Sequence, residues 1–325
     1  MKLHKDKVLF ADVIARAAEH PSQGGLGIRP QFIEKDYWIT NALKHLSESR
    51  FKDNAVFKGG TSLSKAYHIG TRFSEDIDIA IIKTDGMTDA QLKAAIRSTE
   101  KAMSVDLSEI AHPQSTKGSR YRKTFYSYPL LSSSQSMASV IPGQLLFEIN
   151  SFANPFPYQN IEISCFAYHY LAMQMANDII EEFELEPFRI NVLDKRSTMT
   201  EKIVSLIRFS LAENPIPELE AKIRHFYDLH NLLQDSDSRV YLHSIEFAEN
   251  YTALITHDRE SFDNPEGWRE KPIEKSPLLL DFSGLWEVLK KRYSEELRPL
   301  SYSLTIPSVD AIEASMKEIL DVIKN

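Results

Sequence analysis

Two aspartates alternate with isoleucines in the segment 74–82, SEDIDIAII. Of all the features of the sequence, this alternation restricts the possible folds of the chain most strongly. Successive side chains of a β-strand point to opposite faces, so Ile77 and Ile79 predict a buried face while Asp76 and Asp78 share the other. At the rise of a strand, the two carboxylates stand about 7 Å apart along the chain. The pattern predicts a half-buried strand with a paired acidic face.

A glycine pair lies shortly before this strand, in the segment 57–67, FKGGTSLSKAY. The pattern predicts a strand, a tight turn and a helix. Glycines let the backbone approach a phosphate closely, and the N-terminus of the following helix favours an anion. Lys65 is either a phosphate ligand or a surface charge. The nucleotide-binding candidates of this segment are Lys58, Gly59, Gly60, Thr61, Ser62 and Lys65.

A third carboxylate, Glu148, lies in the alternating segment 145–150, LLFEIN. Phe147 and Ile149 are expected to face the core and Glu148 the opposite side. Magnesium prefers hard oxygen ligands, and a carboxylate pair completed by substrate phosphates is its usual site. With Asp76 and Asp78, Glu148 predicts a site for Mg²⁺ or Mn²⁺ in phosphoryl or nucleotidyl transfer. The alternative is an exposed strand face that carries charges without a metal.

Periodicity and turn residues place the other elements and predict two domains. Residues 1–155 are expected to form a core with a mixed sheet, and residues 156–325 a mainly helical domain. Thr198 or Thr200 is a candidate cap for the helix 200–213, with Glu201 completing a capping box to Thr198. Residues 235–277 are expected to be rich in loops. The remaining expected elements are helices at 30–46, 88–108, 218–235, 279–293 and 308–324, and strands at 124–131 and 143–152.

Composition excludes several classes of protein. Of 325 residues, 42% are hydrophobic and 26% charged, which is ordinary for a globular chain and excludes disorder throughout. The single cysteine, Cys165, excludes internal disulfides and zinc sites built on thiolates. No apolar run reaches the 18 or so residues of a membrane span and no secretory signal stands out, so we expect a cytoplasmic protein with no membrane partner.

A formal net charge of −8 argues against a chain that coats nucleic acid without specificity. It leaves room for a local basic groove, and the segment 115–123, STKGSRYRK, offers Lys117, Arg120, Arg122 and Lys123. The alternative for these four cations is a solvated face.

Five motifs in order resemble the AbiEii/AbiGii family of nucleotidyltransferase toxins, relatives of the MenT toxins in the DNA polymerase beta-like nucleotidyltransferase superfamily. The motifs are EKDYW at 34–38, FKGGTSLSKAY, RFSEDIDI at 72–79, EK at 201–202 and HFYDLHNLL at 225–233. The resemblance covers about Arg29 to Gln234. It implies an α+β fold, namely a polymerase beta-like core with a mixed sheet, followed by a mainly helical C-terminal domain that completes the active-site cleft.

The resemblance also assigns roles to residues. It places the phosphate loop on Gly59–Ser62 and the metal pair on Asp76 and Asp78, with Glu148 as the third carboxylate. Lys202 matches the lysine of the family's second domain, and Asp228 matches its later aspartate. Considered by itself, Lys202 could instead be a solvated helix lysine, and Asp228 could instead pair with Arg224 four residues before it.

The function implied by the resemblance is Mg²⁺-dependent transfer of a nucleotide from a nucleoside triphosphate to an RNA hydroxyl, tRNA 3′ ends in particular. The chain would be the toxin of a toxin–antitoxin or phage-defence system and would have a cognate antitoxin. Two alternatives stay open. One is nucleotidyl or phosphoryl transfer to a protein hydroxyl, and the other is a catalytically inactive nucleotide-binding interaction protein.

Overall fold

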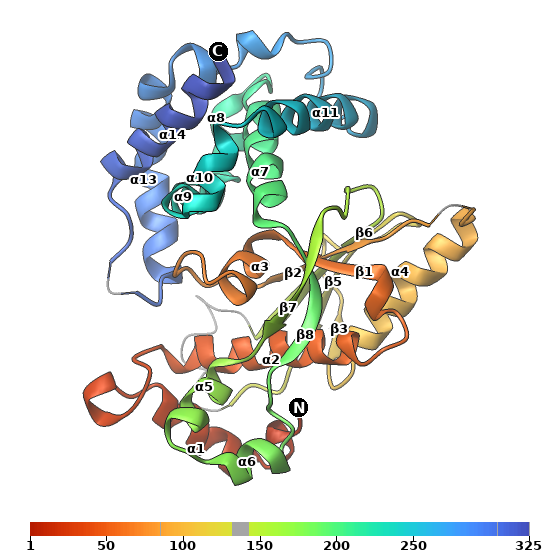
Figure 1. Cartoon of the computed structure of the whole chain (residues 1–325), viewed down its shortest axis with the longest axis vertical. Helices are drawn as coiled ribbons and strands as arrows, with labels where there is room; N and C mark the ends of the chain where they lie inside the picture. The colour runs from red at the N-terminus through yellow and green to blue at the C-terminus, as the bar shows by residue number, and fades with distance from the viewer. Residues whose placement is uncertain (85, 132–142, 304, 325) are drawn as a thin grey trace. The chain divides into compact units, whose positions relative to one another are not determined.

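The computed structural model describes residues 1–84, 86–131, 143–303 and 305–324. The chain forms two compact units (Figure 1). Unit 1 comprises Met1–Ala66 and Phe73–Leu193, and unit 2 comprises Tyr67–Arg72 and Asp194–Asn325. The short segment Tyr67–Arg72 therefore leaves unit 1 between a helix and a strand of that unit and packs within unit 2.

Unit 1 is built on a mixed sheet, which in the described residues has eight strands. Their order is β3-β5-β6-β2-β1-β8-β7, with β4 paired to β5. The β2–β6 and β1–β8 pairs are parallel and the others antiparallel. The strands are β1 (Ala55–Lys58), β2 (Asp76–Ile81), β3 (Ser108–Ile110), β4 (Thr116–Lys117), β5 (Tyr121–Ser127), β6 (Gln144–Asn150), β7 (Tyr158–Ile163) and β8 (Phe188–Leu193).

The helices of unit 1 bury an apolar face of this sheet. Alternation along β2 makes Ile77 and Ile79 fully buried, and Phe147 on β6 joins them. Helix α2 packs on α4 and β8, while α4 packs on β6 (Figure 1). The helices are α1 (Lys7–Ala17), α2 (Pro30–Ser47), α3 (Gly59–Ala66), α4 (Asp89–Met103), α5 (Phe166–Met173) and α6 (Asn177–Glu182), with 3₁₀ turns at Leu3–Lys5, Pro21–Gln23 and Lys52–Asn54.

Local signals explain where two of these helices begin. Pro30 is the first residue of α2, where its missing N–H costs no hydrogen bond. Thr88 caps α4 in a capping box with Gln91. The expected strand 124–131 begins earlier and ends at Ser127, as β5.

The sheet extends beyond residue 155, where the sequence analysis placed the domain boundary. Strands β7 and β8 pair with each other along their length, and β8 pairs with β1 at Phe57 and Val192. Apart from the segment Tyr67–Arg72, the chain stays in unit 1 as far as Leu193. Residue 155 therefore lies inside unit 1, and the segment after it is not purely helical.

Unit 2 is helical, as expected for the C-terminal region. Its helices are α7 (Lys195–Ser210), α8 (Pro215–Glu220), α9 (Ile223–Gln234), α10 (Ser236–Leu242), α11 (Ile245–Ser261), α12 (Pro277–Leu280), α13 (Phe282–Leu300) and α14 (Val309–Lys324), with a 3₁₀ turn at Ile273–Lys275 (Figure 1). Its core includes Phe226 of α9 and Trp286 of α13, whose ring centroids lie 5.4 Å apart.

Three expectations for unit 2 were wrong. Helix α7 begins at Lys195 because Asp194 caps it, so Thr198 and Thr200 lie inside the helix. The expected helix 218–235 is divided into α8 and α9. The segment 235–277 holds α10 and α11, each capped by a side chain, from Asp235 and Ser244 respectively.

None of the helices in the described residues is both long and apolar enough to span a bilayer.

Candidate active site

A row of four charged residues crosses four neighbouring strands of unit 1. Lys58 on β1 is opposite Asp78 on β2, Asp78 is opposite Glu148 on β6, and Glu148 is opposite Lys123 on β5. Residues paired in register point to the same face of a sheet, so the row presents a cation, two carboxylates and a second cation. Asp76 lies on the same face, two residues before Asp78.

The acidic face of β2 stays accessible while its other face is buried. Asp76 and Asp78 are partly exposed, whereas Ile77 and Ile79 have no exposed surface. The predicted alternation is therefore present in the structure. It brings Asp76, Asp78 and Glu148 onto one face, as the sequence analysis expected.

Gly59 shows why the turn before α3 needs a glycine. Its φ is +80°, and a Cβ placed on it would lie 2.0 Å from Oδ2 of Asp78. Any side chain at residue 59 would therefore have to displace the Asp78 carboxylate. The first residue of α3 lies directly against one of the two candidate metal ligands.

The hydroxyls of the turn bind the backbone of unit 1. Thr61 donates to the carbonyl of Asp76 over 2.5 Å, and Ser62 donates to the carbonyl of Gly59 over 2.8 Å. Each hydroxyl has one proton to donate, and both are used here. Within this turn, the N–H groups at the start of α3 remain the natural donors for a phosphate.

Two ion pairs link α2 to the segments that carry the turn and the aspartates. Lys65 of α3 lies 2.6 Å from Asp36 and also donates to the carbonyl of Ser164. Lys35, fully buried on α2, lies 2.5 Å from Glu75, which directly precedes Asp76. Lys65 is thus neither a surface charge nor free to bind a phosphate without breaking this pair.

Glu148 is held by two side chains of β5. Its Oε1 lies 3.0 Å from Nζ of Lys123. Tyr121 also hydrogen-bonds Glu148; burial raises the pKa of Tyr121, and the Glu148 carboxylate raises it further. The third carboxylate is therefore oriented by its neighbours.

Among the described residues, no group of three or more His, Cys, Asp or Glu side chains is arranged to hold a metal ion. Asp76 and Asp78 fit a different kind of site. Magnesium is often held by one or two carboxylates and completed by substrate phosphates and water, without a cage of protein ligands. The partly exposed pair beside the Gly59 turn has the ligand chemistry for such an ion. Glu148, paired with Lys123, is not part of a preformed three-carboxylate cluster.

A second cluster of charges lies within unit 2. Asp228 of α9 is 5% exposed, and Arg72 binds both of its oxygens with two hydrogen bonds of 2.7 Å. Nζ of Lys202, on α7, lies 2.8 Å from Oδ2 of the same carboxylate. Lys202 is 6% exposed and thus not a solvated helix lysine. The structure brings together Lys202 and Asp228, the two residues of this region that the family resemblance singles out.

Asp228 does not pair with Arg224, which instead lies 2.8 Å from Glu296. The alternative of a local salt bridge on α9 was therefore wrong. The partner that the sequence analysis missed is Arg72. Its position as the first residue of the RFSEDIDI motif was the available signal, but nothing local connects it with a residue 156 positions later.

The two cations control the ionisation of Asp228. Burial alone would raise the pKa of Asp228, but the charges and hydrogen bonds of Arg72 and Lys202 outweigh it and hold that pKa well below its usual range. Burial also lowers the pKa of His225 far below its ordinary value, and the nearby Lys202 and Lys222 lower it further. Asp228 therefore stays ionised between two cations.

The segment Tyr67–Arg72 is fixed by other contacts within unit 2. The N–H of Thr71 donates a hydrogen bond of 2.7 Å to the hydroxyl of Tyr227, and the carbonyl of Thr71 accepts one of 3.0 Å from the N–H of Tyr302. Tyr227 and its neighbour Phe226 are buried core residues. These contacts hold Arg72 against Asp228.

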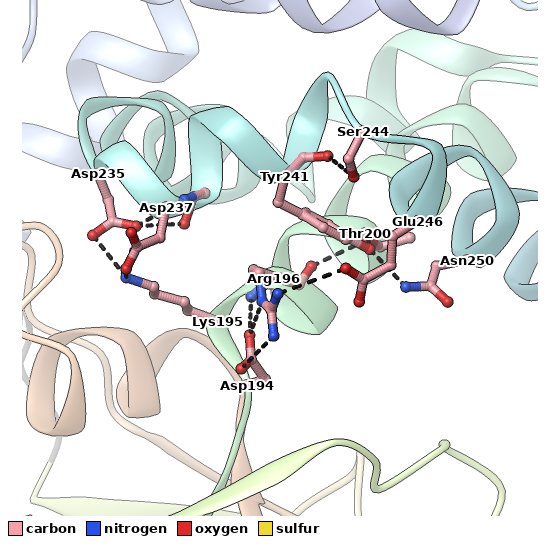
Figure 2. Close-up of polar contacts among 11 residues, drawn as sticks. Asp194, Lys195, Arg196, Thr200, Asp235, Asp237, Tyr241, Ser244, Glu246 and Asn250 are labelled. Atoms are coloured by element: carbon pink, nitrogen blue, oxygen red, sulfur yellow. Dashed lines mark hydrogen bonds and ion pairs between the residues drawn. The ribbon is translucent and has the colours of Figure 1, made fainter.

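The first turn of α7, which leads to Lys202, is fixed by a polar network (Figure 2). Asp194 accepts from the N–H and side chain of Arg196, and Lys195 pairs with Asp235 and Asp237. Further along the helix, the hydroxyl of Thr200 contacts the hydroxyl of Tyr241, which also accepts a hydrogen bond from the side chain of Asn250. Arg196 lies 3.7 Å from Glu246. α7 is thereby tied to α10 and α11.

The basic segment of the sequence analysis is not a free basic groove. Each of its four cations has a carboxylate partner: Glu109 for Lys117, Asp89 for Arg120, Glu100 for Arg122 and Glu148 for Lys123. Arg122 and Lys123 point to opposite faces of the sheet, since they are adjacent on β5. The cations are thus distributed among separate contacts.

Comparison with known proteins places the chain in a family. The sequence model of the family described as "Nucleotidyl transferase AbiEii toxin, Type IV TA system" matches residues 41–315. The match covers most of the chain and includes both charged clusters. The chain therefore belongs to the AbiEii family and is a nucleotidyltransferase, the toxin of a type IV toxin–antitoxin system.

Two solved structures are similar to the chain. The nucleotidyltransferase toxin MenT4 from Mycobacterium tuberculosis is 14% identical, with a TM-score of 0.48 over 95% of this chain and 98% of that chain. The protein JHP933 from Helicobacter pylori is 12% identical, with a TM-score of 0.40 over 92% of this chain and 100% of that chain. No curated protein sequence matches the chain significantly.

Proposed function

We propose that this toxin transfers a nucleoside monophosphate from a nucleoside triphosphate to a hydroxyl of RNA, with the 3′ end of tRNA as the acceptor and Mg²⁺ or Mn²⁺ as the cofactor. The observation that carries the proposal is the paired acidic face of β2 beside the Gly59 turn. It offers hard oxygen ligands next to N–H groups suited to a phosphate. The reaction would take place in the cytoplasm, where triphosphates and tRNA are present.

Asp76 and Asp78 are assigned to the metal. The divalent ion would neutralise charge on the triphosphate and on the leaving pyrophosphate. The start of α3, from Gly59 to Ser62, would hold phosphate oxygens through its backbone N–H groups. Glu148, oriented by Tyr121 and Lys123, would accept the proton of the acceptor hydroxyl as that hydroxyl attacks the α-phosphorus.

Lys202, Arg72 and Asp228 are assigned to the same reaction. Lys202 and Arg72 supply positive charge of the kind that binds phosphate. Lys202 would contact the phosphate as a point charge. Asp228, bound on both oxygens by Arg72, would position the Lys202 ammonium group. A cognate antitoxin would oppose this activity.

The test is incubation of the full chain with Mg²⁺, total bacterial RNA and each of four α-labelled nucleoside triphosphates. We expect label in RNA of tRNA size with one or more nucleotides, and no label with an Asp76→Ala, Asp78→Ala variant. Periodate oxidation of the RNA 3′ end should abolish the label. Label on protein would instead support transfer to a protein hydroxyl. Absence of label with every nucleotide would contradict the proposal.

A further inference from the structure

Three cations form a row along the exposed side of α4. Lys93, Arg97 and Lys101 follow one another at intervals of four residues, and all three side chains are exposed. Four residues of an α-helix rise about 6 Å, so the row extends over about 12 Å. Leu92 and Ile96 lie on the buried side of the same helix. The row thus occupies the face that α4 turns away from the core of unit 1.

These three cations differ from the other cations of this region. The four cations of the segment 115–123 each pair with a carboxylate, and one of those carboxylates is Asp89, at the start of α4. In contrast, Lys93, Arg97 and Lys101 make no ion pair with any residue that the structure describes. Like charges four residues apart disfavour a helix, and an anion bound along the row would relieve this repulsion.

An open furrow runs beside the row, with a volume of about 640 Å³. Arg97 and Lys101 line it together with the hydroxyl-bearing residues Ser98 and Ser104. Its opposite side comes from the segment 107–109 and from β5.

The carboxylates of the furrow are already neutralised. Glu100 is bound by Arg122 and by the hydroxyl of Thr124, and Glu109 pairs with Lys117. The positive charges of Arg97 and Lys101 are therefore the uncompensated charges of the furrow. Its chemistry suits a polyanion with regularly spaced negative groups.

We infer that the α4 face formed by Lys93, Arg97, Lys101 and this furrow binds the phosphodiester backbone of the acceptor RNA. The inference rests on the proposed function, because it names the surface by which that substrate is held. The 6 Å interval between cations is comparable with the distance between successive phosphates along a nucleic-acid strand. The formal charge of the whole chain is −8, so a face with three cations that lack carboxylate partners among the described residues is suited to local contact with RNA.

The probe is a fluorescein-labelled tRNA transcript, and binding is followed by fluorescence anisotropy at several salt concentrations. Nucleotide is left out, so no transfer occurs. In the Lys93→Gln, Arg97→Gln, Lys101→Gln variant, we expect about tenfold weaker binding or more at low salt. Each lost phosphate contact removes about 0.7 to 0.9 from the slope of log K against log salt, so the slope should become shallower by about 2 to 3.

Two further variants make the result specific. The control variant makes the same change in net charge at lysines of α13 and α14 that pair with carboxylates, and it is Lys290→Gln, Lys291→Gln, Lys317→Gln. This variant should bind tRNA as the wild type does. Lys93→Arg, Lys101→Arg keeps the charges and should retain binding. The inference would be overturned if the control variant weakened tRNA binding as much as the Lys93→Gln, Arg97→Gln, Lys101→Gln variant does. It would also be overturned if the latter variant left the salt slope unchanged.

Two other measurements separate this inference from its alternatives. Fluorescein-labelled polyglutamate is tested in the same way, and an equal loss of its binding would overturn the RNA assignment in favour of an acidic protein partner. RNA labelling by the wild type is measured separately. If no RNA is labelled, the proposed function fails, whereas intact labelling with an unchanged binding slope refutes the α4 surface alone.

Discussion

Arg72 and Asp228 lie 156 residues apart in the chain and form a buried ion pair with two hydrogen bonds of 2.7 Å. Lys202 shares the same carboxylate. The pair fixes the segment before the SEDIDI motif to α9 within unit 2. It also holds a carboxylate ionised at a place where burial alone would favour its neutral form.

Replacing Asp228 with asparagine should destabilise the protein strongly. The change leaves two buried cations without their carboxylate, and breaking a buried pair costs about 3 to 5 kcal/mol. Urea unfolding followed by far-UV circular dichroism measures the loss. The control, Glu296→Gln, removes the partner of Arg224 at a more exposed position and should cost less than about 1 kcal/mol. Equal costs for the two variants would contradict the assigned role.

The stability supplied by Asp228 should vanish in acid. Its pKa in the folded state lies below the unfolded value, so the unfolded state takes up the proton first as the pH falls. The difference in unfolding free energy between wild type and Asp228→Asn should be constant near neutral pH. It should then shrink as the pH drops below about 4, the ordinary aspartate pKa. A difference that grows on acidification would show the opposite sign and refute the assignment.

Gly59→Ala should disable the acidic face of β2. Alanine at a φ of +80° is strained, and here its Cβ would also collide with the Asp78 carboxylate. Gly86 offers a matched control, since it has the same φ of +80° and, its chain neighbours aside, no atom of the described residues lies within 4 Å of the position that a Cβ would occupy. We expect Gly59→Ala to be less stable than Gly86→Ala by about 1 to 3 kcal/mol and to lose nucleotide transfer. Equal activity in both variants would show that Asp78 does not need the close approach of Gly59.

Lys123→Met should tighten binding of a divalent metal in the absence of nucleotide. The ammonium group lies 3.0 Å from Glu148 and competes for the negative charge of the face that also carries Asp76 and Asp78. At an effective dielectric constant of about 20 or more, a gain of roughly fivefold in affinity is expected. Mn²⁺ binding followed by electron paramagnetic resonance measures it. Lys117→Met is the control, and weaker Mn²⁺ binding by Lys123→Met would contradict this electrostatic account.

Short-range patterns predicted the parts of the fold that short-range physics determines. The alternation of Asp76 to Ile79 identified a strand with one buried face, and Pro30 marked the start of α2. The pairing of strands that are distant in the sequence could not be predicted from these patterns. Nothing near β7 or β8 in the sequence shows that β8 lies beside β1, so the first unit was expected to end too early.

The candidate site shows the same division. Asp76, Asp78 and Glu148 share a face because the strand period is two, and this could be inferred from the sequence. The contacts of Arg72 with Asp228, and of Lys65 with Asp36, depend on packing between distant segments. The start of α7 was misplaced because the capping-box pattern of Thr198 and Glu201 was followed, although aspartate is the stronger cap and Asp194 takes that position.

The central claim is that the acidic face of β2 carries out metal-dependent nucleotidyl transfer. The most direct measurement is the single-turnover rate of α-labelled nucleotide transfer to RNA for the wild type, Asp76→Asn, Asp78→Asn and the exposed control Asp53→Asn. The account predicts that each of the first two variants loses at least about 100-fold, or about 2.7 kcal/mol of transition-state stabilisation, while the control retains the wild-type rate. Near wild-type rates for Asp76→Asn and Asp78→Asn would contradict it.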